Sequence, residues 1–245
     1  MDRMIFAAMT GARAAVGQLA VTANNLANAS TPGFKEQIAA FRAVPMGGDG
    51  ANTRAFVLDT TPGSYFAGGR IESTASPLDI AIQDKGFIVV QRPDGSQALT
   101  RNGRLSVDSQ GVLRGALGYP IVGQGGNIVL PANSQPDIAD DGTVSVIDSV
   151  SRQPQIIGRI RLVNPAPSTL ERAGDGLFSA KDASINADPE VRVVQGFLEG
   201  SNVNVASAMV AMVSQQRLFD MNMKSIQNAD LNARSANGIM SLSRS

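Results

Sequence analysis

Carboxylates, lysine and tyrosine are the side chains with which this sequence could do chemistry, because the 245-residue chain contains neither histidine nor cysteine. Histidine is the commonest general base and a leading metal ligand, and the cysteine thiolate is a strong nucleophile. Their absence excludes Ser-His triads, Cys-His dyads, histidine-based zinc sites and disulfides. An enzyme of this composition would have to work without the commonest catalytic groups.

The densest acidic cluster, in the stretch DIADDG, fails the test for a calcium-binding loop. Counted from Asp137, the third position is Ala139 and the twelfth is Asp148, where the loop needs an oxygen ligand and a bidentate glutamate. The glycines at 123–126 lack the third glycine of a dinucleotide-binding loop, and a β-like segment follows them instead of a helix. The other acids are scattered in predicted turns. We therefore predict that the protein is not an enzyme and binds no cofactor and no metal ion.

The balance of charge also limits the partners. Lysine plus arginine equal aspartate plus glutamate at 21 each, so there is no electrostatic basis for binding nucleic acid or an anionic membrane surface. Zero net charge permits close self-association. We find no apolar run near the roughly 18 residues that span a bilayer, and Arg13 interrupts the N-terminal stretch. We expect neither direct membrane insertion nor a cleaved signal peptide.

Residues 2–30 predict a long helix. Its apolar and small residues recur at alternating spacings of three and four, which is the pattern of a heptad seam. Asp2 is suited to cap this helix, and Pro32 sets its far boundary because the residue before a proline disfavours the α conformation. The predicted seam comprises Ile5, Ala8, Ala12, Ala15, Leu19, Thr22, Leu26 and Ala29.

Residues 204–242 predict a second helix with the same rhythm, capped by Asn204. Taken singly, each seam is more typical of an ordinary amphipathic helix on a globular core. Two matching seams at opposite ends of one chain instead favour pairing of the two helices. The second predicted seam comprises Val205, Met209, Met212, Gln216, Phe219, Met223, Ile226, Asp230 and Ala233.

The middle of the chain predicts antiparallel β structure. Residues 87–90 form one strand, 157–164 alternate like a half-buried strand, and 192–200 form extended chain that leads into the last helix. Turns are predicted at Asp94-Gly95, Asn102-Gly103, Gln110-Gly111 and Asp141-Gly142.

The predicted fold is α+β: paired, coiled-coil-like N- and C-terminal helices with a central antiparallel β domain inserted between them. Its predicted parts are a helical domain (1–31 plus 203–245), an extended connecting region (32–75 plus 176–202) and the β domain (76–175).

Burial of a single seam does not offset the entropy of ordering such long helices. We therefore predict that both ends are largely disordered in the free subunit and become ordered on assembly. Three asparagines near the end of the first helix, Asn24, Asn25 and Asn28, need an explanation because asparagine is a mediocre helix former. Local capping accounts equally well for Asn28. For the pair at 24–25 we hypothesise that the amides fix the register between subunits.

The chain resembles the bacterial flagellar rod and hook proteins in four stretches that occur in the same order: NNLANASTPGFK, LDIAIQDKGF, TRNGRLSVDSQGVL and GFLEGSNVNVASAMVAMVSQQRLFDMNMKSI. The resemblance implies a structural subunit that stacks helically into the rod, the drive shaft that crosses the periplasm and transmits torque. It implies an inner coiled-coil layer of terminal helices around the export channel. It also implies export by the flagellar type III export apparatus, and partnership with copies of itself and with other rod subunits.

Within this family, FRAVP at 41–45 and LEGSNVN at 198–204 look more like the proximal-rod members than the distal-rod members, which usually are longer and carry glutamate in place of Gly200. A distal-rod subunit remains the alternative, and a β domain that binds polysaccharide is a weaker one, because aromatic residues are few. The subunit interface that the resemblance implies comprises Leu19, Asn24, Asn25, Leu26, Asn28, Met209, Met212, Phe219, Met223 and Ile226, with Phe34 anchoring the chain where it leaves the helix.

Overall fold

The computed structural model describes residues 2–45, 55–131, 134–147, 153–180 and 186–242, and the side chains of 5–40, 63–131, 134–147, 153–180 and 186–235. The chain divides into two compact units. The helical unit comprises Met1–Ala27, Gln37–Gly63 and Asn204–Ser245, and the β unit comprises Asn28–Glu36 and Ser64–Val203. The three-part division expected from the sequence stays a prediction.

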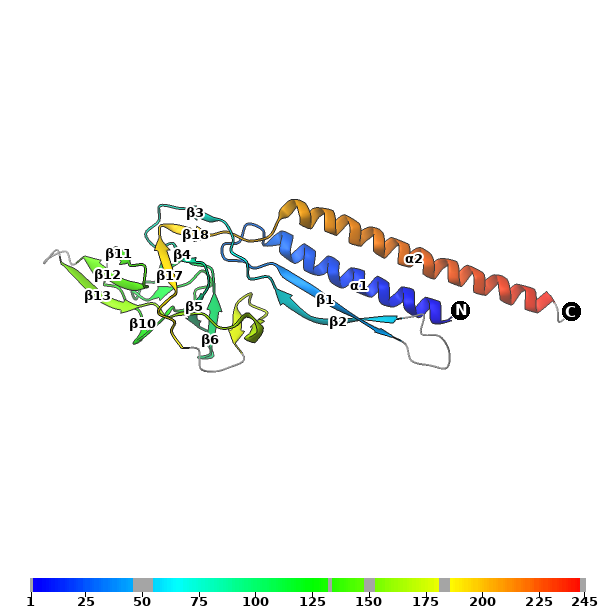
Figure 1. The fold of residues 1–245 in the computed structure, drawn as a ribbon, viewed down its shortest axis with the longest axis horizontal. Helices are drawn as coiled ribbons and strands as arrows, with labels where there is room; N and C mark the ends of the chain where they lie inside the picture. Colours follow the sequence, from blue (N-terminus) through cyan, green and yellow to red (C-terminus); the bar gives the residue numbers. More distant parts are fainter. Residues whose placement is uncertain (1, 46–54, 132–133, 148–152, 181–185, 243–245) are drawn as a thin grey trace. The chain divides into compact units, whose positions relative to one another are not determined.

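The helical unit contains two long helices that lie side by side and run antiparallel (Figure 1). They are α1 (Asp2–Ala27) and α2 (Val205–Leu242), and a two-stranded sheet of β1 (Gln37–Pro45) and β2 (Ala55–Ser64) belongs to the same unit. Two helices with a β-rich region between them confirm the predicted α+β class. Asn204 caps α2 as expected, since its Oδ1 accepts a hydrogen bond of 3.1 Å from the backbone N–H of Ser207. The side chain of Asp2 lies outside the described residues.

The β unit contains several small sheets, and each strand pairing described in it is antiparallel, as predicted. The largest sheet has the order β14 (Leu162–Val163), β5 (Phe87–Gln91), β6 (Gln97–Thr100), β16 (Phe178–Ala180) and β15 (Leu170–Arg172). A three-stranded sheet has the order β11 (Pro136–Ile138), β12 (Thr143–Ile147) and β13 (Pro154–Arg159). The two-stranded sheets join β3 (Ile71–Ser73) to β18 (Phe197–Glu199), β4 (Ile80–Gln83) to β17 (Arg192–Gln195), β7 (Ser106–Val107) to β8 (Leu113–Arg114), and β9 (Val122–Gly123) to β10 (Gly126–Asn127); a short 3-10 helix, η1, spans Pro167–Thr169.

Strand β5 separates two hydrophobic clusters of the β unit. Ile88 and Val90 point into the larger cluster, while Phe87 and Val89 point into a smaller one with Leu99. Because both faces of the strand are buried, its sequence is a continuous apolar run without alternation.

Three of the four predicted turns are confirmed. Gly95, Gly111 and Gly142 take φ of +83°, +81° and +84°, which glycine adopts at little cost. Gly103 does not have a positive φ. A glycine is needed at this position because a Cβ would lie 1.7 Å from the carbonyl oxygen of Ile80.

The prediction of one strand over 157–164 is wrong. Strand β13 ends at Arg159 and β14 begins at Leu162, and the two strands belong to different sheets.

Candidate assembly interface

The two helices face each other along a stripe that we call the inner seam. On α1 its spacing matches the prediction, and Ala8, Ala12, Ala15 and Thr22 are buried. On α2 the less exposed positions also alternate by four and three. The inner seam comprises Ala8, Ala12, Ala15, Leu19, Thr22 and Leu26 on α1, and Ala208, Met212, Gln215, Phe219, Asn222, Ile226 and Ala229 on α2.

The predicted seam of α2 is right at every second position. Met212, Phe219 and Ile226 lie on the inner seam, whereas Met209 and Met223 lie one residue beyond it and are 52% and 37% exposed. The positions that replace them are Gln215 and Asn222. Apolar periodicity alone predicts that Met209 and Met223 belong to the seam. Residue type does not distinguish the inner seam from the stripe of residues beside it.

Two contacts set the register of the helix pair. The Gln215 side chain donates a hydrogen bond of 3.1 Å from Nε2 to Oγ1 of Thr22. Near the other end, a Cβ on Gly11 would lie 2.9 Å from Oδ1 of Asn222, so glycine allows this close approach. Gly11 lies opposite Asn222 and Thr22 lies opposite Gln215, so residue numbers rise along α1 as they fall along α2. The pair is therefore antiparallel.

Asn25 has partners within its own chain. Its Nδ2 donates to the carbonyl oxygen of Gln37 at 2.9 Å, and its Oδ1 accepts from the backbone N–H of Gln37 at 2.8 Å. The side chain is therefore satisfied on both of its polar atoms and ties α1 to the first residue of β1. Buried amides need such partners, since an unmet one costs about 1–3 kcal/mol. The role predicted for Asn25 between subunits stays a prediction.

The other residues predicted near the end of α1 take separate positions. Asn24 is exposed, and Oδ1 of Asn28 accepts a hydrogen bond of 3.2 Å from the Thr31 hydroxyl within the turn after the helix. In the β unit, the ring of Phe34 lies under the Arg172 guanidinium, with 4.7 Å from Cζ to the ring centroid. Leu19 and Leu26 are half-buried on the inner seam.

Sequence reasoning missed a buried ionic cluster in the β unit. Glu199 accepts hydrogen bonds from Lys35 Nζ at 2.6 Å and from Arg101 Nε at 2.7 Å, and all three side chains are almost fully buried. The backbone N–H of Gly69 donates to the same carboxylate at 2.8 Å. We call Lys35, Arg101 and Glu199 the ionic cluster. It holds the segment that follows α1 to the segment that precedes α2.

The electrostatics of the ionic cluster follow from burial and proximity. Burial lowers the pKa of the Lys35 ammonium below its ordinary value, against the opposing effect of Glu199. Burial alone would raise the pKa of the Glu199 carboxyl, but Arg101, Lys35 and the Gly69 N–H outweigh it and lower that pKa. The carboxylate is thus held ionised between two cations. Two of these three charges, Lys35 in PGFK and Glu199 in LEGSN, stand beside apolar residues in the sequence, and that placement was the available signal.

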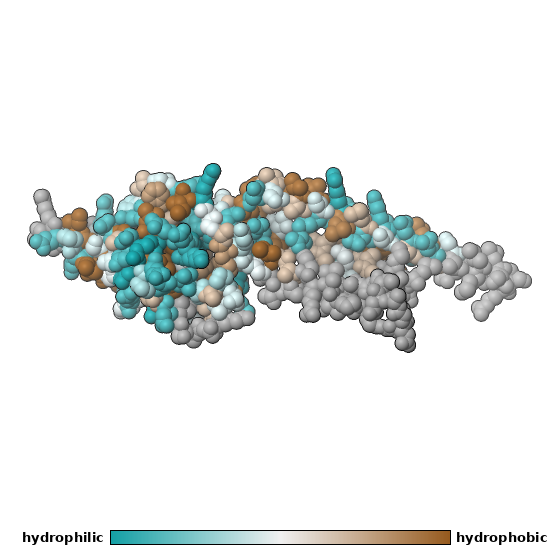
Figure 2. All heavy atoms as spheres, in the orientation of Figure 1, coloured by the Kyte–Doolittle hydropathy of each residue, from teal (hydrophilic) through white to brown (hydrophobic). Residues whose placement is uncertain are grey.

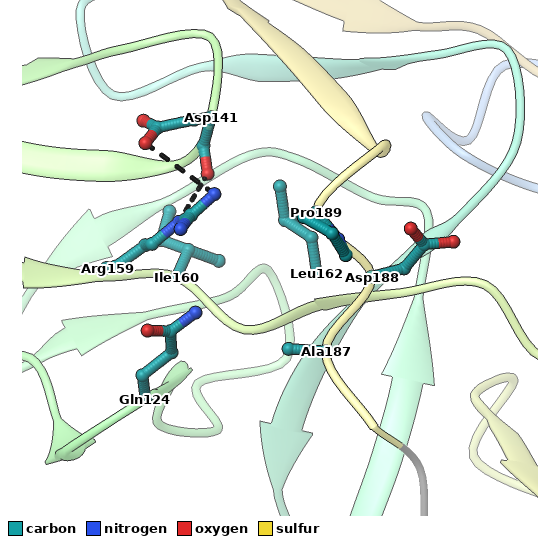
Figure 3. A pocket seen from close by; sticks show the side chains of 8 residues that line it. All are labelled: Gln124, Asp141, Arg159, Ile160, Leu162, Ala187, Asp188 and Pro189. Carbon is teal, nitrogen blue, oxygen red and sulfur yellow. Dashed lines mark hydrogen bonds and ion pairs between the residues drawn. The ribbon is translucent and has the colours of Figure 1, made fainter.

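A small cavity lies elsewhere in the β unit (Figure 3). Its volume is about 70 Å³, well below the several hundred Å³ typical of sites for small-molecule ligands. Arg159 pairs with Asp141 at 3.6 Å at its edge. The cavity is lined by Gln124, Asp141, Arg159, Ile160, Leu162, Ala187, Asp188 and Pro189.

Helix α1 corrects one expectation about membranes. Residues Ile5–Ala27 are long and apolar enough to cross a bilayer by length and composition alone, so the prediction that no run approaches that length is wrong. The reason is that Arg13 is the single charged residue among these 23 residues. The core helix of a soluble protein and a signal sequence pass the same test, so this is weak evidence for a membrane span.

Comparison with known proteins matches three segments of the chain to flagellar families. Residues 5–35 match "Flagella basal body rod protein", 81–146 match "Flagellar hook protein FlgE/F/G D1 domain", and 194–239 match "Flagellar basal body rod FlgEFG protein C-terminal". The last match spans most of α2.

Individual relatives align over almost the whole chain. The flagellar basal-body rod protein FlgF of Escherichia coli is 42% identical over 252 residues, covering 99% of this chain and 100% of that protein. FlgF of Salmonella typhimurium is 41% identical with the same coverage. The flagellar basal-body rod protein FlgG of Buchnera aphidicola is 36% identical over 248 residues, covering 90% of this chain and 93% of that protein. The chain therefore belongs to the family of flagellar basal-body rod proteins, the structural subunits of the bacterial flagellar rod.

Proposed function

We propose that this chain is a subunit of the proximal part of the flagellar rod. The observation that carries the proposal is its 42% identity to FlgF of Escherichia coli over the full length of both proteins. FlgG of Buchnera aphidicola, at 36% identity, supports a distal-rod subunit as the second candidate.

In this proposal the terminal helices pair as a coiled coil and polymerise into the layer that encloses the export channel. The support is physical. Exposed apolar residues are concentrated on the helices, where they would destabilise a subunit that stayed alone in water. Figure 2 shows hydrophobic patches that interrupt the polar surface along the helical unit. The residues include Phe6, Met9, Val16, Met209, Val210, Val213, Leu218, Met221 and Leu231.

The interface residues named from the resemblance belong to this proposal. Leu26, Met212, Phe219 and Ile226 already contribute to the inner seam of one subunit. Met209 and Met223 are exposed and are therefore available to a neighbouring copy.

The proposal includes transport and location. The chain passes the flagellar type III export apparatus without loss of a signal peptide and assembles in the rod where it crosses the periplasm. Neighbouring copies, and not a bilayer, cover the apolar surface of α1. The protein has no enzymatic activity in this role and works by transmitting torque.

The test is to produce the chain in a flagellated bacterium that lacks its own proximal-rod subunit. We expect motility to return and the intact chain to be present in purified basal bodies. A chain absent from the basal bodies would overturn the proposal. Restored motility in a strain that lacks only the distal-rod subunit would instead favour the second candidate.

A further inference from the structure

Asn202, which shortly precedes α2, binds the backbone of two distant segments of the β unit. Its Oδ1 accepts a hydrogen bond of 2.7 Å from the backbone N–H of Glu36. Its Nδ2 donates to the carbonyl oxygens of Tyr65 at 2.8 Å and Ala67 at 3.1 Å. Its own backbone N–H donates to the carbonyl oxygen of Phe34 at 3.4 Å. Because both polar ends of the amide are used, this one side chain holds three segments together.

The ionic cluster joins the same three segments. The Glu199 carboxylate accepts hydrogen bonds from Lys35 at 2.6 Å and from the backbone N–H of Gly69 at 2.8 Å. The Glu199 carbonyl oxygen also accepts a hydrogen bond of 2.7 Å from the backbone N–H of Gly33. We call the joined segments the clasp, and they comprise residues 33–36, 65–69 and 199–202.

Each segment of the clasp lies next to a point where the chain passes between the two units. The chain makes this passage four times, after residues 27, 36, 63 and 203. Lys35 follows the end of α1 by eight residues, and Glu199 precedes the start of α2 by six. The clasp therefore gathers, within the β unit, the stretches of chain that lead to both helices.

A closed clasp shortens the loop that separates the two helices. Gly11 lies against Asn222 in the helix pair, although the two residues are far apart in the sequence. With the clasp closed, the chain between them runs only from Gly11 to Lys35 and from Glu199 to Asn222, which is about 50 residues instead of about 210. The entropic cost of closing a loop grows as (3/2)RT ln n, so the clasp raises the chance that the helices meet by up to about tenfold.

We propose that the clasp brings α1 and α2 together in the free chain, with Asn202 and Glu199 as its positioning residues. Burial of a single seam does not offset the entropy of ordering such long helices. A tether that holds their inner ends together raises the effective concentration of one helix near the other and lowers that entropic cost. The inference goes beyond the proposed rod role, because it concerns the chain before any other subunit binds.

The test measures this effective concentration through an engineered disulfide in the full chain. The chain has no cysteine, so the pair Gly11→Cys and Asn222→Cys has no competing thiol. A Cβ on residue 11 would lie 3.2 Å from Cγ of Asn222, which places two cysteines within reach of a disulfide. The equilibrium of this pair with glutathione gives the effective concentration. Adding Asn202→Ala should lower it roughly threefold or more, because the loop between the helices lengthens.

Ile138→Ala is the matched control, because it removes a buried side chain of β11 and weakens the β unit outside the clasp. It should leave the effective concentration unchanged, even where urea unfolding shows a loss of stability as large as that of Asn202→Ala. If tyrosine fluorescence shows that Asn202→Ala unfolds the β unit, Asn202→Asp takes its place, since it keeps the shape and removes only the Nδ2 donors.

Two results would overturn the inference. An unchanged effective concentration in the Asn202 variant would show that the helices meet without the clasp. An equal fall in the Ile138→Ala control would show that general stability of the β unit, and not the clasp, decides the pairing. The measurement uses no basal bodies, so its outcome is independent of whether the chain enters the rod.

Discussion

Replacing Glu199 by glutamine tests whether the ionic cluster holds the β unit together. Glu199→Gln keeps the shape of the side chain and removes its charge. Lys35 and Arg101 then remain, with side chains 1% and 4% exposed and with no other ion-pair partner among the described residues. Two buried cations without a counter-charge are strongly unfavourable.

The expected loss of stability is large for a change of this size. Removing one partner of a buried ion pair costs about 3–5 kcal/mol, and here one carboxylate serves two cations. Deprotonation of Lys35 limits the cost, because burial already lowers its pKa. We therefore expect a loss of about 3–5 kcal/mol in the free energy of unfolding, a large share of the roughly 5–15 kcal/mol typical of a domain.

Urea unfolding followed by tyrosine fluorescence measures this loss, because both tyrosines, Tyr65 and Tyr119, lie in the β unit. Glu72→Gln is the matched control, since Glu72 is exposed on β3 opposite Leu198 in the strand that also contains Glu199. A loss for Glu199→Gln as small as that of the control would refute the reasoning.

Comparing the wild type with Glu199→Gln as the pH is lowered tests the ionisation of Glu199. The pKa of Glu199 is lowered on folding, so its contribution is fully present above the ordinary value of about 4.3 and is lost as the pH falls through the lower, folded value. The wild type should lose stability over this acid range more steeply than Glu199→Gln. Parallel pH profiles for the two proteins would contradict the assignment of a lowered pKa.

Three further predictions concern the helical unit. Leu26→Asp places an unpaired charge on the half-buried inner seam. It should abolish incorporation into the rod while the β unit stays folded. A motile strain with this variant would contradict the assignment of Leu26 to the inner seam. Asn25→Asp removes the Nδ2 donor to the Gln37 carbonyl and should destabilise the helical unit by about 1–3 kcal/mol. Urea unfolding followed by far-ultraviolet circular dichroism measures this loss. The control Asn228→Asp, at an exposed position, should change the stability little. Hydrogen–deuterium exchange on the free subunit should be fast over 1–35 and 200–245 and slow in the β unit; strong protection of both ends in a confirmed monomer would show that the helices need no partner.

The sequence by itself determined the features that depend on neighbours along the chain. Heptad spacing placed both helices, Asn204 marked the start of α2, and glycines at 95, 111 and 142 marked three turns, because periodicity, capping and left-handed backbone are local properties. The order of the motifs also indicated the family.

Only the tertiary structure decided which side chains meet. Residue type could not show that Gln215 and Asn222, and not Met209 and Met223, face α1, because a polar residue on a close-packed helix pair looks like a surface residue in the sequence. The partner of Asn25 in β1 and the pairing of Lys35 with Glu199, 164 residues apart, come from how the chain returns on itself. Such long-range contacts depend on where distant segments are brought in space, and one-dimensional spacing carries no measure of that.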